Sequence, residues 1–377
     1  MTRVLVLGGG SGGLVAANKV KRLLGKEVEV TLVDRNTHHE FMPAYPWVAF
    51  GMQEPEEIRR PLANLERRGI QYLQATVEAL DPERHRVKTT AGELAYDYLI
   101  VSLGAEALPS PAQDGHAPWS LAGALRLREA LKGFKGGRVV VGVSSPYYPC
   151  PPAPYEVAGQ MEFALKVKGI RAKSTVEVFH LNPAPLAGMG PVISGKALEI
   201  LKSKDIAFHG EFEPVAFEGG KVKAKDGREL SYDLLVLVPP FAPNRVVRES
   251  PLAGPQGFPE VDRTTFRSLR FPNVFVIGDT VNPALMLPPA GVVAHFQGEY
   301  VAGVIASDLK GAYIGEPFNS AAMCIIDFGD NALLPQCSFD RVLSGTGMPS
   351  CGVMAVGKWV RVTKMLFEGF WFATLIE

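Results

Sequence analysis

The sequence predicts an α/β protein built from two doubly wound, Rossmann-type domains and a C-terminal amphipathic region. Three observations lead to this prediction. A buried-strand pattern at the N-terminus runs into a glycine cluster and a helix, a second such strand begins at Arg138, and a helical apolar face begins at Lys358. We expect a first domain over 1–110 and 240–306, a second over 111–239, and a C-terminal region over 307–377.

Composition excludes several classes of protein. The 377 residues contain 39 Lys plus Arg and 39 Asp plus Glu, so the chain lacks the basic excess of a nucleic-acid binder. A hydrophobic content of 47% and a mean hydropathy of +0.09 exclude disorder. No apolar run reaches the roughly 18 residues of a membrane-spanning helix, and no signal-peptide pattern precedes the first strand. We therefore expect a cytoplasmic protein.

The first element is a strand, a glycine turn, a helix and a second strand. A strand over 3–7 leads into Gly8-Gly9-Gly10-Ser11-Gly12-Gly13, a helix follows over about 14–24, and a strand over 28–33 ends at Asp34. This is the G-x-G-x-x-G fingerprint in its required context, with an acid 21 residues after the last glycine. Gly8 permits the tight turn, Gly10 admits a diphosphate and Gly13 brings helix and strand together, while the helix N-terminus favours the anion. Asp34 would accept a hydrogen bond from a ribose hydroxyl, so we predict a dinucleotide site.

Two later strands, over 96–105 and 271–279, end in small-residue turns, the second in Gly278-Asp279. Taken alone, such a turn needs no ligand. Together with the first fingerprint, both stretches resemble the second and third FAD signatures of two-domain flavoproteins of the glutathione-reductase fold. The resemblance implies that Asp279 bonds the ribityl chain of FAD. It implies FAD contacts at Gly8, Gly10, Ser11, Gly12, Gly13, Asp34, Arg35, Val77, Ser102, Gly104, Gly278, Asp279, Gly291 and Lys364.

The second domain offers a strand but no second fingerprint. The strand over 138–143 is followed by a turn over 144–156 that contains five prolines and no G-x-G-x-x-G motif. Proline lacks the N–H group that a diphosphate needs. We therefore expect that no nicotinamide cofactor binds here.

Four further stretches are similar to the sulfide:quinone oxidoreductase family. They are Tyr45-Pro46-Trp47-Val48, Cys150 followed six residues later by Glu156, Cys324-Ile325-Ile326-Asp327-Phe328-Gly329-Asp330, and the run from Gly357 to Glu368. Tyr45 departs from the pattern, since the family usually has Asn there. The resemblance covers nearly the whole chain.

The resemblance implies that Cys150 and Cys324, which are 174 residues apart, face each other beside the flavin and cycle through a disulfide. Hydrosulfide attacks such a bridge and leaves a persulfide and a thiolate. We assign the flavin contact to Cys324 and the persulfide to Cys150, and the reverse assignment stays open. The family position of Glu156 implies a general base or proton relay, whereas a surface glutamate opening a helix is the alternative.

The other two cysteines, Cys337 and Cys351, match no family position, and we expect them to be structural residues. Four cysteines are too few and too scattered for a disulfide framework, and a lasting disulfide in the cytoplasm would need a catalytic reason. No C-x-x-C pair occurs, so we expect no metal. The third cysteine of many relatives is absent between Ala105 and Arg138, which leaves a covalent link to FAD undecided.

The tail predicts an amphipathic helix from Lys358. Its apolar face comprises Trp359, Val362, Leu366, Phe367, Phe370 and Trp371, and its polar face Arg361, Lys364 and Glu368. By resemblance this helix docks peripherally on a membrane, Phe367 sandwiches the quinone ring, and Lys364 stabilises reduced FAD. A dimer contact, a helix packed on the flavin domain and a solvated lysine are the alternatives.

These features predict an enzyme that oxidises sulfide or a persulfide through FAD and passes electrons to membrane quinone. Three alternatives remain: the flavoprotein subunit of a flavocytochrome c sulfide dehydrogenase, a type II NADH:quinone dehydrogenase, and a non-catalytic FAD-binding sulfur or redox sensor. We assign no role to His180, His295 or the pair His38-His39, since lone histidines are usually structural. A homo-oligomer is left open.

Overall fold

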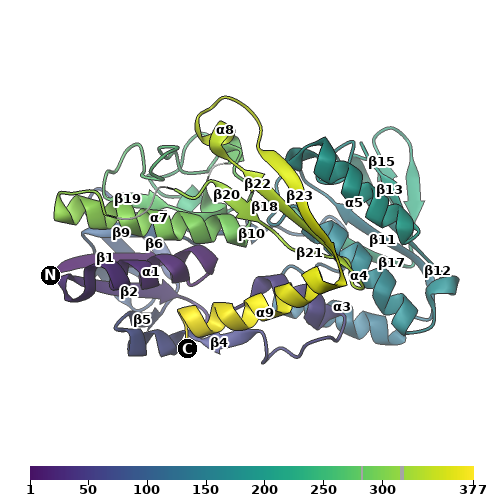
Figure 1. Cartoon of the computed structure of the whole chain (residues 1–377), viewed down its shortest axis with the longest axis horizontal. Coiled ribbons are helices and arrows are strands. Elements are labelled where there is room, and N and C mark those ends of the chain that lie inside the picture. Colours follow the sequence, from purple (N-terminus) through teal and green to yellow (C-terminus); the bar gives the residue numbers. More distant parts are fainter. Residues whose placement is uncertain (282, 315–317) are drawn as a thin grey trace.

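The computed structural model describes residues 1–281, 283–314 and 318–377 and is drawn in Figure 1. Its first sheet has the strand order β19-β9-β1-β2-β5, and all neighbouring strands are parallel. The helices α1 and α7 pack against each other beside this sheet. The bounds are β1 Thr2–Leu7, α1 Ser11–Leu24, β2 Val28–Asp34, β5 Gln71–Gln74, β9 Tyr98–Val101, β19 Val274–Val276 and α7 Gly291–Lys310.

The apolar runs of the sequence explain this sheet. Residues Val4 to Leu7 of β1 and all of β19 are buried, as expected of parallel strands that are covered on both faces. An antiparallel sheet, β6-β7-β8, also belongs to this part of the chain, and its buried side chains share a core with the first sheet. Its strands are β6 Val77–Asp81, β7 Arg86–Thr89 and β8 Gly92–Ala95. The glycine loop therefore begins where a rigid, buried strand ends.

The second parallel sheet has the order β13-β12-β11-β17. It comprises β11 Gly137–Val143, β12 Ser174–Phe179, β13 Ile206–His209 and β17 Leu234–Val238, with helices α3 Leu121–Gly133, α4 Ala153–Val167 and α5 Pro191–Ser203. A small antiparallel sheet adjoins it, formed by β14 Pro214–Glu218, β15 Lys221–Ala224 and β16 Glu229–Ser231. The chain passes between the two parallel sheets twice, and one short strand lies in each of these connections. The two strands, β10 Ala105–Ala107 and β18 Phe241–Pro243, pair in antiparallel orientation.

A third sheet lies in the C-terminal region, where β22 pairs with β20, β21 and β23 in antiparallel register. Its strands are β20 Ala321–Met323, β21 Ile326–Asp327, β22 Ala332–Ser338 and β23 Ser350–Gly357, and helix α9 Lys358–Leu375 follows directly. The yellow α9 runs back toward β4 (Figure 1). The remaining short elements are β3 His38–Glu40, α2 Tyr45–Ala49, β4 Arg59–Pro61, α6 Arg245–Arg248 and α8 Asp340–Leu343.

The third sheet corrects one expectation. Cys337 and Cys351 form a disulfide, with a Cα–Cα distance of 4.0 Å. The prediction that a lasting disulfide would occur only for a catalytic reason is therefore wrong. The two residues are direct cross-strand partners in the β22–β23 register. Their spacing of 14 residues in the sequence reflects a hairpin, and only the register of that hairpin brings the sulfurs together. The bridge links β22 to β23, and a structural role for both cysteines stays a prediction.

Candidate functional site

The glycine loop over 8–13 connects β1 to α1 and is shaped for close backbone contacts. Gly8 has φ +99°, and a Cβ there would lie 2.2 Å from the carbonyl oxygen of Ser102. A Cβ at Gly13 would lie 1.9 Å from the Gly8 carbonyl oxygen, so neither position accepts a side chain. A Cβ at Gly10, by contrast, would meet nothing within 4 Å, so the loop leaves open space in front of the N-terminus of α1.

Asp34 ends β2 beside this loop. Its Oδ2 accepts a hydrogen bond of 2.6 Å from the Gly9 N–H, and its Oδ1 accepts one of 2.7 Å from the Asn36 N–H. The carboxylate thus braces the glycine turn, and each oxygen keeps a further lone pair for a ribose hydroxyl. The neighbouring Arg35 is exposed.

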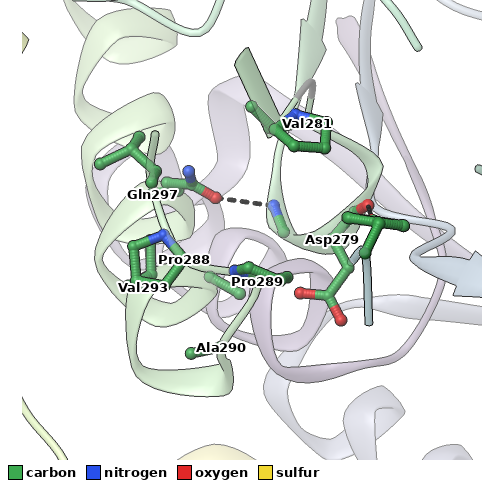
Figure 2. Close-up of a pocket in the computed structure, with 12 residues that line it drawn as sticks. Asp279, Val281, Pro288, Pro289, Ala290, Val293 and Gln297 are labelled. Atoms are coloured by element: carbon green, nitrogen blue, oxygen red, sulfur yellow. Dashed lines mark hydrogen bonds between the residues drawn. The ribbon is translucent and has the colours of Figure 1, made fainter. Parts of the chain in front are cut away.

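The second and third expected FAD segments meet the loop from the adjoining strands. The Ser102 hydroxyl would lie 3.1 Å from a Cβ at Gly12, and the Gly104 N–H donates to the Thr280 hydroxyl over 2.8 Å. The Gly278 N–H donates to Gln297 over 2.7 Å, which is the bond dashed in Figure 2. Gly291 opens α7 beside Ser11. Val77 is buried at the start of β6.

Asp279 lies in a small pocket that Gly278, Pro289, Ala290 and Gln297 help to line (Figure 2). Burial raises the pKa of its carboxyl to about 6. Within the described ranges 1–281, 283–314 and 318–377, we find no hydrogen-bond donor for this carboxylate. A half-buried carboxyl without a donor is suited to accept a hydrogen bond from a ligand hydroxyl. Together with the open glycine loop, it makes these residues a fit for FAD.

Cys150 lies on the loop between β11 and α4. Its backbone has φ 58°, which is rare for a residue with a side chain. Its N–H donates to the Pro289 carbonyl over 2.6 Å, and the Tyr147 hydroxyl donates to the Asp279 carbonyl over 2.8 Å. Two bonds therefore hold the Cys150 loop against the segments expected to contact FAD.

Cys324 lies between β20 and β21, and its N–H donates to the Pro335 carbonyl over 3.3 Å. Burial and the charge of Glu156 raise the pKa of its thiol to about 12. Burial, Glu156 and Cys324 raise the pKa of the Cys150 thiol well above its usual value. Neither cysteine is in a disulfide, and Cys324 lies close enough to Cys150 to raise the pKa of its thiol.

A buried ion pair stands beside the two cysteines. Lys364 Nζ lies 2.5 Å from Glu156 Oε1, which also accepts the Asp327 N–H over 2.7 Å. Burial alone would lower the pKa of Lys364, but Glu156 and Asp327 outweigh it and raise that pKa. Burial raises the pKa of Glu156 despite the opposing charge of Lys364. The alternatives of a surface Glu156 and a solvated Lys364 are therefore wrong, because both side chains are buried.

Three further residues belong to the site, and the sequence alone predicted no individual contact for any of them. They are Asp327, Trp47 and Arg361. The fully buried Asp327 carboxylate accepts the Trp47 indole N–H over 2.8 Å and the Arg361 Nε–H over 3.2 Å. Lys364 Nζ also lies 5.4 Å from the Trp47 ring centroid. Asp327 was signalled by its place three residues after Cys324, but nothing in the spacing identified its partners.

Helix α9 turns its charged face inward. Lys364 pairs with Glu156, Arg361 with Asp327, and the Glu368 carboxylate accepts a bond of 2.8 Å from Gln53. The outward face is apolar, with exposed fractions of 59% for Trp359, 53% for Val362, 48% for Met365, 69% for Leu366 and 64% for Phe370. Phe367 lies at the edge of this face, with its ring centroid 6.1 Å from Phe41 and 6.0 Å from Trp371.

An apolar cluster lies at the carboxyl ends of neighbouring strands of the second sheet. In a doubly wound fold, this is the place where a nucleotide binds. Val143 ends β11 and Val238 ends β17, and both pack with the buried Tyr148. Trp119, Leu181 and Phe241 complete the cluster. His180 supports it by bonding the Tyr148 hydroxyl over 2.9 Å.

A model of the family described as pyridine nucleotide-disulphide oxidoreductase matches residues 2–298. The mitochondrial sulfide:quinone oxidoreductase of Mus musculus is 28% identical over 314 residues, which cover 78% of this chain and 68% of the relative. The type II NADH:quinone oxidoreductase Ndh of Mycobacterium tuberculosis is 30% identical, covering 82% of this chain and 73% of the relative.

Among solved structures, the sulfide:quinone oxidoreductase of Aquifex aeolicus superposes with a TM-score of 0.88 at 24% identity. The superposition covers 100% of this chain and 91% of that chain. The whole architecture described above, including the third sheet and α9, is thus shared with that structure.

Proposed function

The chain belongs to the pyridine nucleotide-disulphide oxidoreductase family and, within it, to the sulfide:quinone oxidoreductases. From this premise we propose that it oxidises sulfide at Cys150 and Cys324 and passes the electrons through FAD to membrane quinone. One observation carries this proposal. Two half-buried cysteines 174 residues apart are both affected by the charges of the buried Glu156 and Lys364, beside the segments that fit FAD.

The reaction begins with the two cysteines as a disulfide. Hydrosulfide attacks Cys150 Sγ, so that an S–S bond forms to the incoming sulfur and the Cys150–Cys324 bond breaks. The products are a Cys150 persulfide and a Cys324 thiolate. The charge of Lys364 opposes the rise in the pKa of the Cys324 thiol that burial and Glu156 cause, and thus favours this leaving group.

A second hydrosulfide then takes the outer sulfur from Cys150 and leaves as hydrodisulfide, which returns Cys150 to a thiol. Re-forming the disulfide from the Cys150 thiol and the Cys324 thiolate releases one proton and two electrons. The glycine loop over 8–13 and Asp279 would hold FAD, which would supply the two-electron acceptor for this pair and its route to quinone, where two protons would also be taken up. The net donor reaction converts two HS⁻ into HSS⁻, one H⁺ and two electrons.

Glu156 is suited to take up the proton that leaves Cys150. Burial and the charge of the Glu156 carboxylate raise the pKa of both thiols, so a nearby proton acceptor assists the loss of a proton from Cys150. Its own pKa is raised by burial, which brings a carboxylate closer to the range of a general base. The bond from the Asp327 N–H fixes its position.

The filled second sheet supports sulfide rather than a nicotinamide as the donor. The cluster around Tyr148 occupies the usual crevice, and the adjoining loop has five prolines and no glycine fingerprint. This observation weighs against NADH oxidation despite the 30% identity with the mycobacterial NADH:quinone oxidoreductase.

The outer face of α9 supports peripheral docking on a membrane. Within the described parts of the chain, no helix is long and apolar enough to span a bilayer. The exposed Trp359, Leu366 and Phe370 instead form an apolar surface of the kind that inserts into the headgroup layer. Phe367, beside Phe41 and Trp371, is our candidate for contact with the quinone ring.

The decisive experiment mixes the purified holoenzyme anaerobically with sulfide and, separately, with NADH while the flavin absorbance is recorded. We expect rapid bleaching by sulfide alone, which a short-chain quinone reverses without a cytochrome. Cys150→Ser and Cys324→Ser should abolish bleaching, whereas the matched double variant Cys337→Ser/Cys351→Ser should retain it. Retained bleaching in either single variant, or bleaching by NADH alone, would contradict the proposal.

Docking is tested by flotation with phospholipid vesicles. The wild type should rise with the vesicles, and Phe370→Glu should lose at least half of its bound fraction because the charge must remain in water. Leu269→Glu, at a side chain that is 65% exposed and far along the chain, is the control. Equal flotation of both variants would refute docking through α9.

A further inference from the structure

His39 lies between the glycine loop and helix α9. The side chain is buried, and its Nδ1 is 2.8 Å from the Gly9 carbonyl oxygen. On its other side, the Trp371 indole N–H donates to His39 Nε2 over 2.9 Å. The His39 ring also packs against Trp371, at a centroid distance of 5.9 Å, and against Phe372, at 6.3 Å.

These two contacts fix the state of the imidazole. An indole nitrogen can only donate, so Nε2 of His39 must be the acceptor and carries no proton. Nδ1 therefore carries the proton and donates it to the Gly9 carbonyl. Burial lowers the pKa of His39, which is consistent with a neutral ring. His39 is thus a bridge with a defined direction, from Trp371 through the ring to Gly9.

The end of α9 is fastened to the same region by other bonds. The Asn18 amide on α1 donates to the Leu375 carbonyl over 3.0 Å, and Arg68 Nη1 donates to the Thr374 carbonyl over 2.8 Å. Asn18 and Arg68 thereby satisfy carbonyl groups at the C-terminal end of α9. Figure 1 shows α9 running below α1, and α1 is the helix that directly follows the glycine loop.

Gly9 is held at both of its backbone polar groups. Its N–H donates to Asp34, and its carbonyl accepts from His39. With Gly9 held in this way, its neighbour Gly10 borders the open space expected for the FAD diphosphate. Neither His39 nor Trp371 needs to touch the cofactor to affect how it is held.

We infer that His39 is a positioning residue through which helix α9 holds the FAD diphosphate loop in its binding conformation. The helix that presents the membrane- and quinone-facing surface is therefore also a support of the cofactor site. This inference rests on the FAD part of the proposed function and is independent of the sulfide chemistry.

The test compares two Trp→Phe variants of the holoenzyme. Trp371→Phe keeps an aromatic ring but removes the N–H that His39 accepts. Trp119→Phe is the matched control, because the Trp119 Nε1 is buried without a hydrogen-bond partner in the described structure. Amide hydrogen exchange over residues 8–14 and the ³¹P resonances of bound FAD are measured for both.

We expect the loop of Trp371→Phe to exchange about five- to tenfold faster than the wild type, the size of effect expected when one buried hydrogen bond is lost. Its ³¹P resonances should shift, whereas Trp119→Phe should match the wild type in both readouts. His39→Phe should give an effect at least as large, and adding Trp371→Phe to it should add nothing, because both break the same bridge.

Equal exchange and equal ³¹P shifts in the two Trp variants would overturn the inference. A wild-type protein that purifies without flavin would instead contradict the proposed function. Both readouts apply whether or not FAD is covalently attached, because neither depends on dissociation or on turnover.

Discussion

Replacing Lys364 with methionine tests the buried ion pair at the centre of the site. The Lys364 and Glu156 side chains are each 6% exposed, and their charged atoms are 2.5 Å apart. Removing one partner of such a pair typically costs about 3–5 kcal/mol, because the other charge stays buried without compensation. We expect Lys364→Met to lose about 3 kcal/mol of unfolding free energy, since Glu156 keeps the bond from the Asp327 N–H.

The assay is denaturant unfolding of the flavin-loaded protein, followed by circular dichroism. The double variant Glu156→Gln/Lys364→Met should be more stable than the sum of the two single losses predicts, by about 1–3 kcal/mol. Lys196→Met is the control, because Lys196 pairs with Glu199 at the surface over 2.7 Å and exposed pairs contribute about 0–1 kcal/mol. A Lys364→Met loss no larger than that of Lys196→Met, or strict additivity in the double variant, would refute the reasoning.

The same variant predicts a change at alkaline pH. The raised folded pKa of Lys364 contributes stability that is fully present below its unfolded pKa of about 10.4 and is lost as pH rises through the folded value. The wild type should therefore lose this part of its unfolding free energy above about pH 10.4, and Lys364→Met should show no such loss. Glu156 acts in the same sense but in a more acidic range, because its raised pKa also favours the folded state as pH falls.

Two other predictions concern the disulfide and the glycine loop. The Cys337→Ser/Cys351→Ser variant should lose about 3 kcal/mol in the same unfolding assay, the value for a closed loop of about 15 residues, and a loss below about 1 kcal/mol would contradict a structural role. Gly8→Ala should purify with little flavin, as measured by the ratio of flavin to protein absorbance. The reason is that the new Cβ would lie 2.2 Å from the Ser102 carbonyl oxygen, whereas Gly188→Ala, with nothing within 4 Å, should retain FAD.

Local patterns predicted the parallel strands and the glycine loop, because both depend on residues close together in the sequence. The run from Val4 to Leu7 is apolar because both faces of its strand are covered, and Gly8 and Gly13 stand where the turn admits no Cβ. The resemblance to a known family supplied the prediction that Cys150 and Cys324 form a redox pair, which stays a prediction. Spacing alone could not have done so across 174 residues.

Local patterns in the sequence did not predict the features that depend on strand register or on contacts between distant residues. The Cys337–Cys351 bridge depends on which residues of β22 and β23 lie opposite each other. The positions of the two cysteines in the sequence do not indicate this register. The sequence likewise identified a charged face on α9 without indicating its direction. A periodic pattern defines two faces of a helix, but the partners of each face decide which one points inward.

The direction of α9 is itself an argument for what covers it. Burying Arg361, Lys364 and Glu368 is unfavourable unless each finds a partner, and Asp327, Glu156 and Gln53 supply those partners. The inward charges leave the apolar side chains of the opposite face, such as Trp359, Leu366 and Phe370, exposed. Each large apolar side chain left in water forgoes about 1.5–3 kcal/mol, so this arrangement is favourable overall when an apolar phase meets the outer face. The contacts of Arg361, Lys364 and Glu368 therefore fix the orientation of the helix, with Leu366 and Phe370 on its outer face.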